Sequence, residues 1–360
     1  MNKPKILYVL PTLKKDGAEV QIANLIKNCD NFEIDLFTFD LYRIGDSIEQ
    51  NLGEIKVFSK KRILSIIEIY KLIQVNNYDI VHSHLPKADL FVGLINLFNN
   101  SFIHIISVHA QYGTRTEESK IKYLFFNIFW KFILNRSDGV IAISGKIKKW
   151  LVQNKKISSK KITTIHYGIE ITNRTESTLN GNTIGMAARI LPWKGWEGVL
   201  KVALVLKKQN LDYKLIFAGS DDINYKKTLV EKVKEQGLEE YVFFHNHYEN
   251  IEDFFSKIDL FLFLSESEGF GLVVLEAIEN NTPVICSNIE PLSEFVDNSF
   301  NTLVNPNNFN DIATLAAKIL DDKNFKNKVQ TKQKEKIIKE FSIGKASYKY
   351  ENYYIKLLNN

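Results

Sequence analysis

The 360-residue sequence is poor in cysteine, with only Cys29 and Cys286. Two cysteines do not form a disulfide framework, and such scarcity is typical of a reducing compartment, so we expect a cytoplasmic location. The sequence also lacks an apolar run of 18 residues, which excludes a membrane-spanning helix. The apolar stretch after Pro4 is too short for the core of a signal peptide, and we expect it to form an opening strand.

Several ligand-binding signatures are absent as well. The sequence has no zinc-ligand spacing, arginine-rich recognition helix or RNA-binding aromatic motif, so nucleic acid is not an expected partner. No G-x-G-x-x-G motif follows the first predicted strand, where Gly17 stands alone. This argues against a bound dinucleotide.

The net charge of +5 is unevenly distributed. Residues 1–165 carry 24 lysines and arginines against 15 acidic residues, a net charge of +9, whereas the remaining residues carry 23 against 27, a net charge of −4. A basic first half indicates an anionic partner. We expect a membrane surface or a lipid-linked phosphate, which would hold the protein peripherally on the inner face of the cell membrane.

Strand-like apolar runs alternate with helical patterns along most of the chain. In the first half the predicted strands are 4–10, 33–40, 54–58, 79–82, 103–108 and 139–143. A polar segment at 170–182 predicts a linker. After it the predicted strands are 183–187, 213–218, 241–244, 259–264 and 283–286. This alternation predicts an α/β fold with two doubly wound parallel sheets.

The most informative segment runs from residue 259 to residue 277. A strand pattern ends at Ser265, a turn containing glycines follows, and a helical pattern begins after the turn. Such a turn presents backbone N–H groups at the carboxyl edge of a sheet, where α/β proteins bind phosphorylated ligands. Glu268 and Glu276 frame the turn with seven residues between them. The alternative is that both carboxylates merely cap and solvate the start of the helix.

A second informative segment, residues 185–196, carries two cations after a predicted strand. Arg189 and Lys194 are five positions apart. Together they suit a diphosphate, because arginine forms forked hydrogen bonds and lysine acts as a point charge. The alternative is a pair of solvated basic residues in a loop.

Together these segments resemble the retaining glycosyltransferases of family 4, which have the GT-B fold. The donor domain of that family carries an arginine–lysine pair and two glutamates separated by seven residues, and the match continues through residues 281–285. The resemblance implies two Rossmann-like domains that face each other across a cleft. Residues 1–168 would bind the acceptor and residues 169–342 the donor, and a last helix at about 343–360 would pack back on the first domain.

The resemblance also implies a role for each site residue. Arg189 and Lys194 would stabilise the leaving diphosphate, Glu268 would bind hydroxyls of the donor sugar, and Glu276 would hold the ribose. His109 would lie near the donor sugar. The other residues expected to contact the donor are Gly17, Gly269, Phe270, Gly271 and Leu272. The family generally works without a metal, so no metal or other cofactor is expected.

The resemblance is looser in the first half. The segments containing His82, His84 and His109 resemble strand-end histidine segments of the family, and Tyr167 stands where an asparagine is usual. His82 and His84 alternate at strand spacing and would suit a metal pair, but no acidic partner lies nearby in the sequence. We therefore assign them no metal.

The implied reaction is transfer of a sugar from a nucleotide-diphosphosugar with retention of its anomeric configuration. We expect a UDP-sugar as donor and a glycan or lipid-linked acceptor, in synthesis of a bacterial capsule, O-antigen or related surface polysaccharide. The alternatives are a nucleotide-sugar epimerase, another two-domain nucleotide-binding enzyme and a dinucleotide-dependent oxidoreductase. A binding module without activity is least expected, because it gives no reason for two cations and two carboxylates at one site.

Residues 119–134 form an unusually aromatic helical pattern. We expect this helix to pack its apolar face on the first sheet. The alternative is a helix in a membrane interface, because Lys120, Lys122 and Lys131 accompany its apolar residues. The lysines around Trp150 favour the same alternative.

Overall fold

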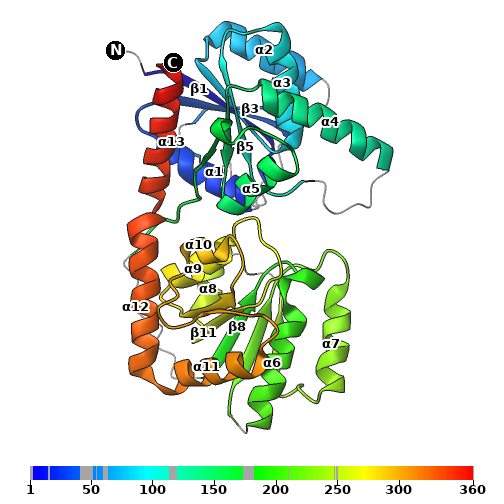
Figure 1. The fold of residues 1–360 in the computed structure, drawn as a ribbon, viewed down its shortest axis with the longest axis vertical. Coiled ribbons are helices and arrows are strands. Elements are labelled where there is room, and N and C mark those ends of the chain that lie inside the picture. The colour runs from blue at the N-terminus through cyan, green and yellow to red at the C-terminus, as the bar shows by residue number, and fades with distance from the viewer. Residues whose placement is uncertain are drawn as a thin grey trace. The chain divides into compact units, whose positions relative to one another are not determined.

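The computed structural model describes residues 3–14, 17–40, 52–53, 55–59, 64–112, 120–172, 182–209, 211–246, 248 and 250–359. The chain divides into two compact units. The first unit combines Met1–Glu170 with Ile343–Asn360, and the second comprises Ile171–Ser342. Each unit is a parallel sheet covered by helices (Figure 1).

The first unit contains a parallel sheet with the strand order β3-β2-β1-β4-β5-β6-β7. Its strands are β1 (Lys5–Thr12), β2 (Glu33–Asp40), β3 (Val57–Ser59), β4 (Ile80–His84), β5 (Ile103–Val108), β6 (Gly139–Ala142) and β7 (Ile162–Thr164). Central strands such as β1 are apolar without a break, because helices cover both faces of a parallel sheet.

The last described helix belongs to the first unit although it follows the second in sequence. The helices of this unit are α1 (Gly17–Lys27), α2 (Leu64–Asn76), α3 (Pro86–Phe98), α4 (Lys120–Arg136), α5 (Gly145–Gln153) and α13 (Ile343–Leu358). Tyr350 and Tyr354 of α13 are buried in the same core cluster as Tyr8 of β1. Glu351 accepts hydrogen bonds from the backbone and side chain of Asn31, at 2.9 and 2.7 Å. These contacts fix α13 to the first unit.

The second unit repeats the architecture with the strand order β10-β9-β8-β11-β12-β13. Its strands are β8 (Thr183–Ala187), β9 (Lys214–Ala218), β10 (Val242–His245), β11 (Leu260–Phe263), β12 (Val284–Ser287) and β13 (Leu303–Val304). Its helices are α6 (Trp196–Lys208), α7 (Tyr225–Glu235), α8 (Ile251–Phe255), α9 (Leu272–Glu279), α10 (Leu292–Phe295), α11 (Phe309–Asp321) and α12 (Lys323–Glu340). β8 and β11 are neighbours at the centre of this sheet, so the segments that follow them start side by side.

The α/β class and the two parallel sheets are confirmed. The edge strands β7 and β13 were not predicted, because two or three residues are too few to show a strand pattern. Most of the expected linker at 170–182 lies outside the described residues. Within the described part of the chain, no helix is both long enough and apolar enough to cross a membrane.

Candidate active site

The glycine turn before α9 is shaped by backbone geometry. Gly271 has φ +96°, and a Cβ atom added to it would lie 2.4 Å from Leu292 Cδ2. Only glycine combines this left-handed conformation with such a close approach. The preceding Phe270 is buried and stacks on Phe295 with ring centroids 5.2 Å apart. Its side chain therefore anchors the turn, and a ligand would meet the backbone.

The turn after β8 packs directly against the end of β11. Gly195 has φ +91°, and an added Cβ would lie 2.1 Å from the carbonyl oxygen of Leu264. In the same turn, two residues before Gly195, the carbonyl of Trp193 accepts a hydrogen bond of 2.9 Å from the backbone N–H of Glu266. The two segments predicted to carry the chemistry are therefore adjacent in the fold.

This adjacency brings Lys194 and Glu268 together. Lys194 Nζ lies 2.7 Å from Glu268 Oε1 and 2.8 Å from Oε2, and the two side chains are only 16% and 7% exposed. Lysine carries three N–H donors, so one remains for a ligand. A largely buried ion pair beside a helix start can bind an anion through its cation and hydroxyls through its carboxylate.

Arg189 lies on the same turn as Lys194, but its side chain is exposed. Its backbone carbonyl accepts a hydrogen bond of 3.4 Å from Trp196 Nε1, which holds the main chain in place. No described residue forms a hydrogen bond or ion pair with its guanidinium group. The structure thus places Arg189 near the pair without joining it to the pair.

Glu276 lies one turn into α9, and Leu272 is the first residue of that helix. Glu276 is partly buried, and burial raises the pKa of its carboxyl to about 7. The carboxylate has no hydrogen-bond partner among the described residues. A carboxyl group held in this way is available to a ligand hydroxyl.

In the first unit, His109 follows β5 and forms part of a buried hydrogen-bonded chain. Its Nε2 atom lies 3.0 Å from His84 Nδ1, and its Nδ1 atom shares a hydrogen bond with the Tyr167 hydroxyl. Burial lowers the pKa of His109 to about 3 and holds that of His84 well below its usual value. His109 is therefore neutral at physiological pH, and both of its ring nitrogens are engaged inside the protein.

Sequence reasoning singled out His84 and Tyr167 but gave neither a role. The Nε2 atom of His84 is buried and has no hydrogen-bond partner among the described residues. His82 contacts Tyr354 and Ser107 instead, each at 2.8 Å. The strand alternation at 82 and 84 was the signal that both rings lie on one face, and their aromatic contact at 4.1 Å between centroids bears this out.

Gly17 begins α1 at the end of the segment that follows β1, and it is exposed. Two residues later, Glu19 is buried and accepts a hydrogen bond of 3.1 Å from Thr12 Oγ1. This bond joins the carboxyl end of β1 to the first turn of α1. Asp16, the residue before Gly17, lies outside the described residues.

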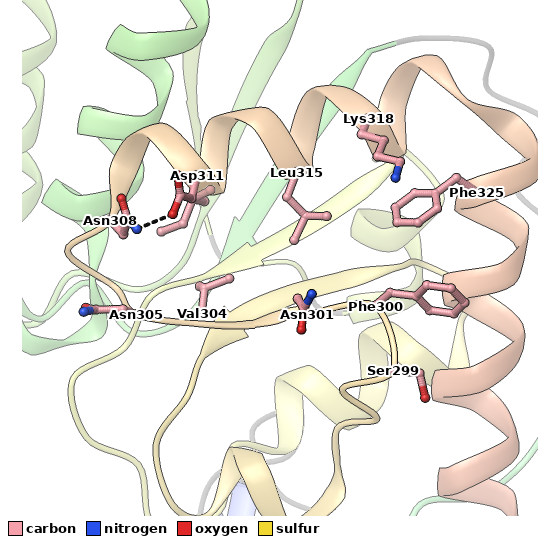
Figure 2. A pocket seen from close by; sticks show the side chains of 11 residues that line it. Ser299, Phe300, Asn301, Val304, Asn305, Asn308, Asp311, Leu315, Lys318 and Phe325 are labelled. Atoms are coloured by element: carbon pink, nitrogen blue, oxygen red, sulfur yellow. Dashed lines mark hydrogen bonds between the residues drawn. The ribbon is translucent and has the colours of Figure 1, made fainter.

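A cavity of about 560 Å³ lies between β13 and α11, and it contains none of the predicted residues (Figure 2). Lys318 stands over the ring of Phe325, with Nζ 4.1 Å from the centroid. The described side chains that line this cavity form no ion pair like that of Lys194 and Glu268. In the same described part of the chain, no group of three His, Cys, Asp or Glu residues is arranged to hold a metal.

Two family models match adjacent parts of the chain. "Glycosyltransferase Family 4" matches residues 13–173, and "Glycosyl transferases group 1" matches residues 169–336. The chain belongs to the group 1 glycosyltransferases. It is therefore a transferase, and neither an epimerase nor an oxidoreductase is supported.

Individual proteins that resemble this glycosyltransferase are glycosyltransferases as well. It is 28% identical over 374 residues to the O-antigen biosynthesis glycosyltransferase WclY of Escherichia coli, covering 98% of each chain. It is 24% identical to the E. coli UDP-Gal:alpha-D-GlcNAc-diphosphoundecaprenol alpha-1,3-galactosyltransferase, covering 83% of this chain and 81% of that one. The crystal structure of Anabaena Alr3699/HepE in complex with UDP and glucose matches with a TM-score of 0.81 and 18% identity, over 98% and 99% of the two chains. This likeness identifies the fold as GT-B.

Proposed function

We propose that the protein transfers a sugar from a UDP-sugar to a lipid-linked glycan in bacterial surface polysaccharide synthesis, and that the sugar keeps its anomeric configuration. The observation that carries this proposal is the Lys194–Glu268 pair at the glycine turn before α9. An ammonium group beside a helix start suits a diphosphate, and the neighbouring carboxylate suits sugar hydroxyls.

Breaking the bond between sugar and phosphate leaves negative charge on the diphosphate. The third N–H donor of Lys194 and the exposed guanidinium of Arg189 stabilise that charge as it develops. Family resemblance implies attack on the front face, with the departing phosphate oxygen accepting the proton of the acceptor hydroxyl. Under this mechanism Glu268 holds Lys194 and binds sugar hydroxyls, and no carboxylate nucleophile is required.

The remaining donor contacts are assigned to α9 and the turn before it. Glu276 accepts hydrogen bonds from the ribose, and the backbone N–H groups of Phe270 and Gly271 meet the sugar or phosphate, with Gly269 and Leu272 as further donor contacts. In this proposal the first unit binds the acceptor and the second binds the donor. The family resemblance also assigns Gly17 and His109 of the first unit to donor contacts, and His109 would act there as a neutral ring. No metal takes part.

Donor and acceptor classes rest on the relatives. One relative is named for UDP-Gal and a diphosphoundecaprenol acceptor, another for O-antigen biosynthesis, and the matched HepE structure contains UDP. A lipid-linked acceptor agrees with the net charge of +9 over residues 1–165. We place the protein in the cytoplasm, at the inner face of the membrane.

The test combines binding with turnover. A thermal-shift panel of UDP, GDP, ADP and NAD should show stabilisation by UDP above all, because a ligand stabilises the state that binds it. Incubation with labelled UDP-sugars and undecaprenyl-diphosphate saccharides should then give a product whose anomeric configuration, measured by NMR, equals that of the donor. An inverted product would overturn the retaining mechanism, and stabilisation by GDP or ADP alone would overturn the donor assignment.

A further inference from the structure

Helix α4 has two apolar faces, only one of which is covered. Trp130, Ile133 and Leu134 are fully buried against the first unit. On the opposite side, four large apolar side chains are exposed by 45–69% of their surface: Leu124, Phe125, Ile128 and Phe132. The expected packing on the first sheet thus accounts for one face, and α4 projects from the rest of its unit (Figure 1).

Basic residues accompany the exposed face, on α4 itself and in the sequence that follows it. Between residues 120 and 169 the sequence contains 11 lysines and arginines and a single acidic residue, Asp138. Lys131 and Arg136 are exposed on α4 itself, and Lys149 is exposed on α5. Like charges this dense would repel a second copy of the same face, whereas they complement an anionic surface.

A cavity of about 370 Å³ adjoins this face, lined by Ile128, Lys131 and Lys155 among others. Lys155 is buried, and its Nζ atom lies 4.9 Å from the ring centroid of Trp150 and 5.6 Å from that of Trp130. Its hydrogen-bond partner is the neutral side chain of Asn127. No described carboxylate pairs with this cation, so an anion entering the cavity would gain an unusually strong contact.

We propose that the α4 face docks on an anionic phospholipid bilayer: Leu124, Phe125, Ile128 and Phe132 enter the acyl boundary, and Lys131 and Lys155 contact lipid phosphates. Apolar side chains flanked by lysines are the pattern of interfacial helices, whose binding adds apolar burial to attraction by anionic lipid. The proposal rests on the α4 surface alone. Vesicle binding does not measure sugar transfer, so failure of either proposal can be recognised separately.

The first test is co-sedimentation with vesicles of phosphatidylcholine, with or without phosphatidylglycerol. Wild type should bind the anionic vesicles, and the variant Phe125→Ser with Ile128→Ser should bind them about tenfold more weakly. Lys131→Glu should also weaken binding by about tenfold. The matched controls are Phe98→Ser, at a side chain 90% exposed on α3, and Lys71→Glu on α2. Both controls should bind as wild type does.

The second test locates the contact in the native fold. Both natural cysteines are buried, so Ile128→Cys can be labelled selectively with a polarity-sensitive fluorophore, and Phe98→Cys serves as the control. The label at position 128 alone should shift to shorter wavelength with anionic vesicles. Equal binding of all variants, equal binding of neutral vesicles, or a dimer in sedimentation equilibrium that Phe125→Ser abolishes would each overturn the proposal.

Discussion

Lys194 and Glu268, 74 residues apart in sequence, form an ion pair in which both carboxylate oxygens contact one ammonium nitrogen, at 2.7 and 2.8 Å. The pair exists because Gly195 lets the turn after β8 touch the end of β11. Each of the two charged groups therefore neutralises its partner and can also contact a ligand. Structural and catalytic contributions can be separated by changing the charges singly and together.

Replacing Lys194 by methionine should leave the Glu268 carboxylate buried without a counter-charge. We expect the free energy of unfolding to fall by about 3 kcal/mol and kcat to fall by about 100-fold. The double variant Lys194→Met with Glu268→Gln should regain most of the stability and none of the activity. Urea unfolding and donor turnover measure the two effects. A double variant that recovers activity would show that the pair serves the fold only.

Arg189 should behave differently, because its side chain is exposed and supports no neighbour. Arg189→Ala should change the free energy of unfolding by less than about 0.5 kcal/mol, yet lower kcat/KM by about 100-fold. Arg189→Lys should recover only part of the loss, because lysine cannot form the forked contact. Lys208→Ala, at an exposed side chain that ends α6, is the matched control and should keep full activity. Unchanged turnover in Arg189→Ala would remove the residue from the site.

If Glu276 holds the ribose as proposed, its raised pKa of about 7 should make UDP affinity dependent on pH. Only the ionised carboxylate accepts hydrogen bonds from both ribose hydroxyls, so affinity should rise as pH rises. Between pH 6 and pH 8 the ionised fraction grows about tenfold, and the dissociation constant should fall by a similar factor. Calorimetric titration at pH 6, 7 and 8 measures this. The Glu276→Gln variant retains the pH dependence that comes from ionisation of the UDP phosphates, but it should lack the part that comes from Glu276. If wild type and variant gave the same profile of dissociation constant against pH, the assignment of Glu276 to the ribose would be refuted.

The buried histidines predict sensitivity to acid. His104 and His109 have a pKa of about 3 in the folded protein, against an ordinary value of about 6.5. Between these values the unfolded chain binds more protons than the folded one, so stability falls as pH falls from about 6.5 towards 3. Each histidine contributes up to about 1.4 kcal/mol per pH unit within that window. It contributes almost no pH dependence above pH 7.

Urea unfolding at pH 4, 5, 6 and 7 measures this slope. His109→Gln should flatten it by the share of one histidine. His245→Gln, at an exposed histidine of the second unit, is the matched control and should leave the slope unchanged. A His109→Gln variant with the wild-type slope would show that His109 already titrates normally in the folded protein.

Local patterns in the sequence were sufficient for the two sheets, because most central strands are short apolar runs, and β4 and β5 keep enough apolar residues around their buried histidines to show the pattern. They were not sufficient for β13, because two residues are too few to show the hydrophobic pattern of a strand. The site divides in the same way. Residue types and spacing indicated Arg189, Lys194, Glu268 and Glu276, but the contact between Lys194 and Glu268 depends on two turns meeting across adjacent strands.

The histidine chain shows the limit most clearly. His109 and Tyr167 are 58 residues apart, and nothing in either local sequence indicates their hydrogen bond. The pKa of His109 also depends on burial by several elements, which no spacing rule conveys. Similarly, the apolar pattern of α4 could not reveal which of its two apolar faces is covered.

The place of α13 has a consequence for how the protein is made. The backbone N–H of Ile343 donates to the carbonyl of Ile169 at 2.8 Å, where the chain returns to the first unit. Tyr350 and Tyr354, which fill that unit's core, leave the ribosome after the whole second unit has been synthesised. Domains usually finish folding in order from the N-terminus. In this protein the second unit can complete its fold first, because the first unit lacks α13 until synthesis ends. Until then, the apolar surface that α13 covers in the first unit stays exposed and can bind chaperones.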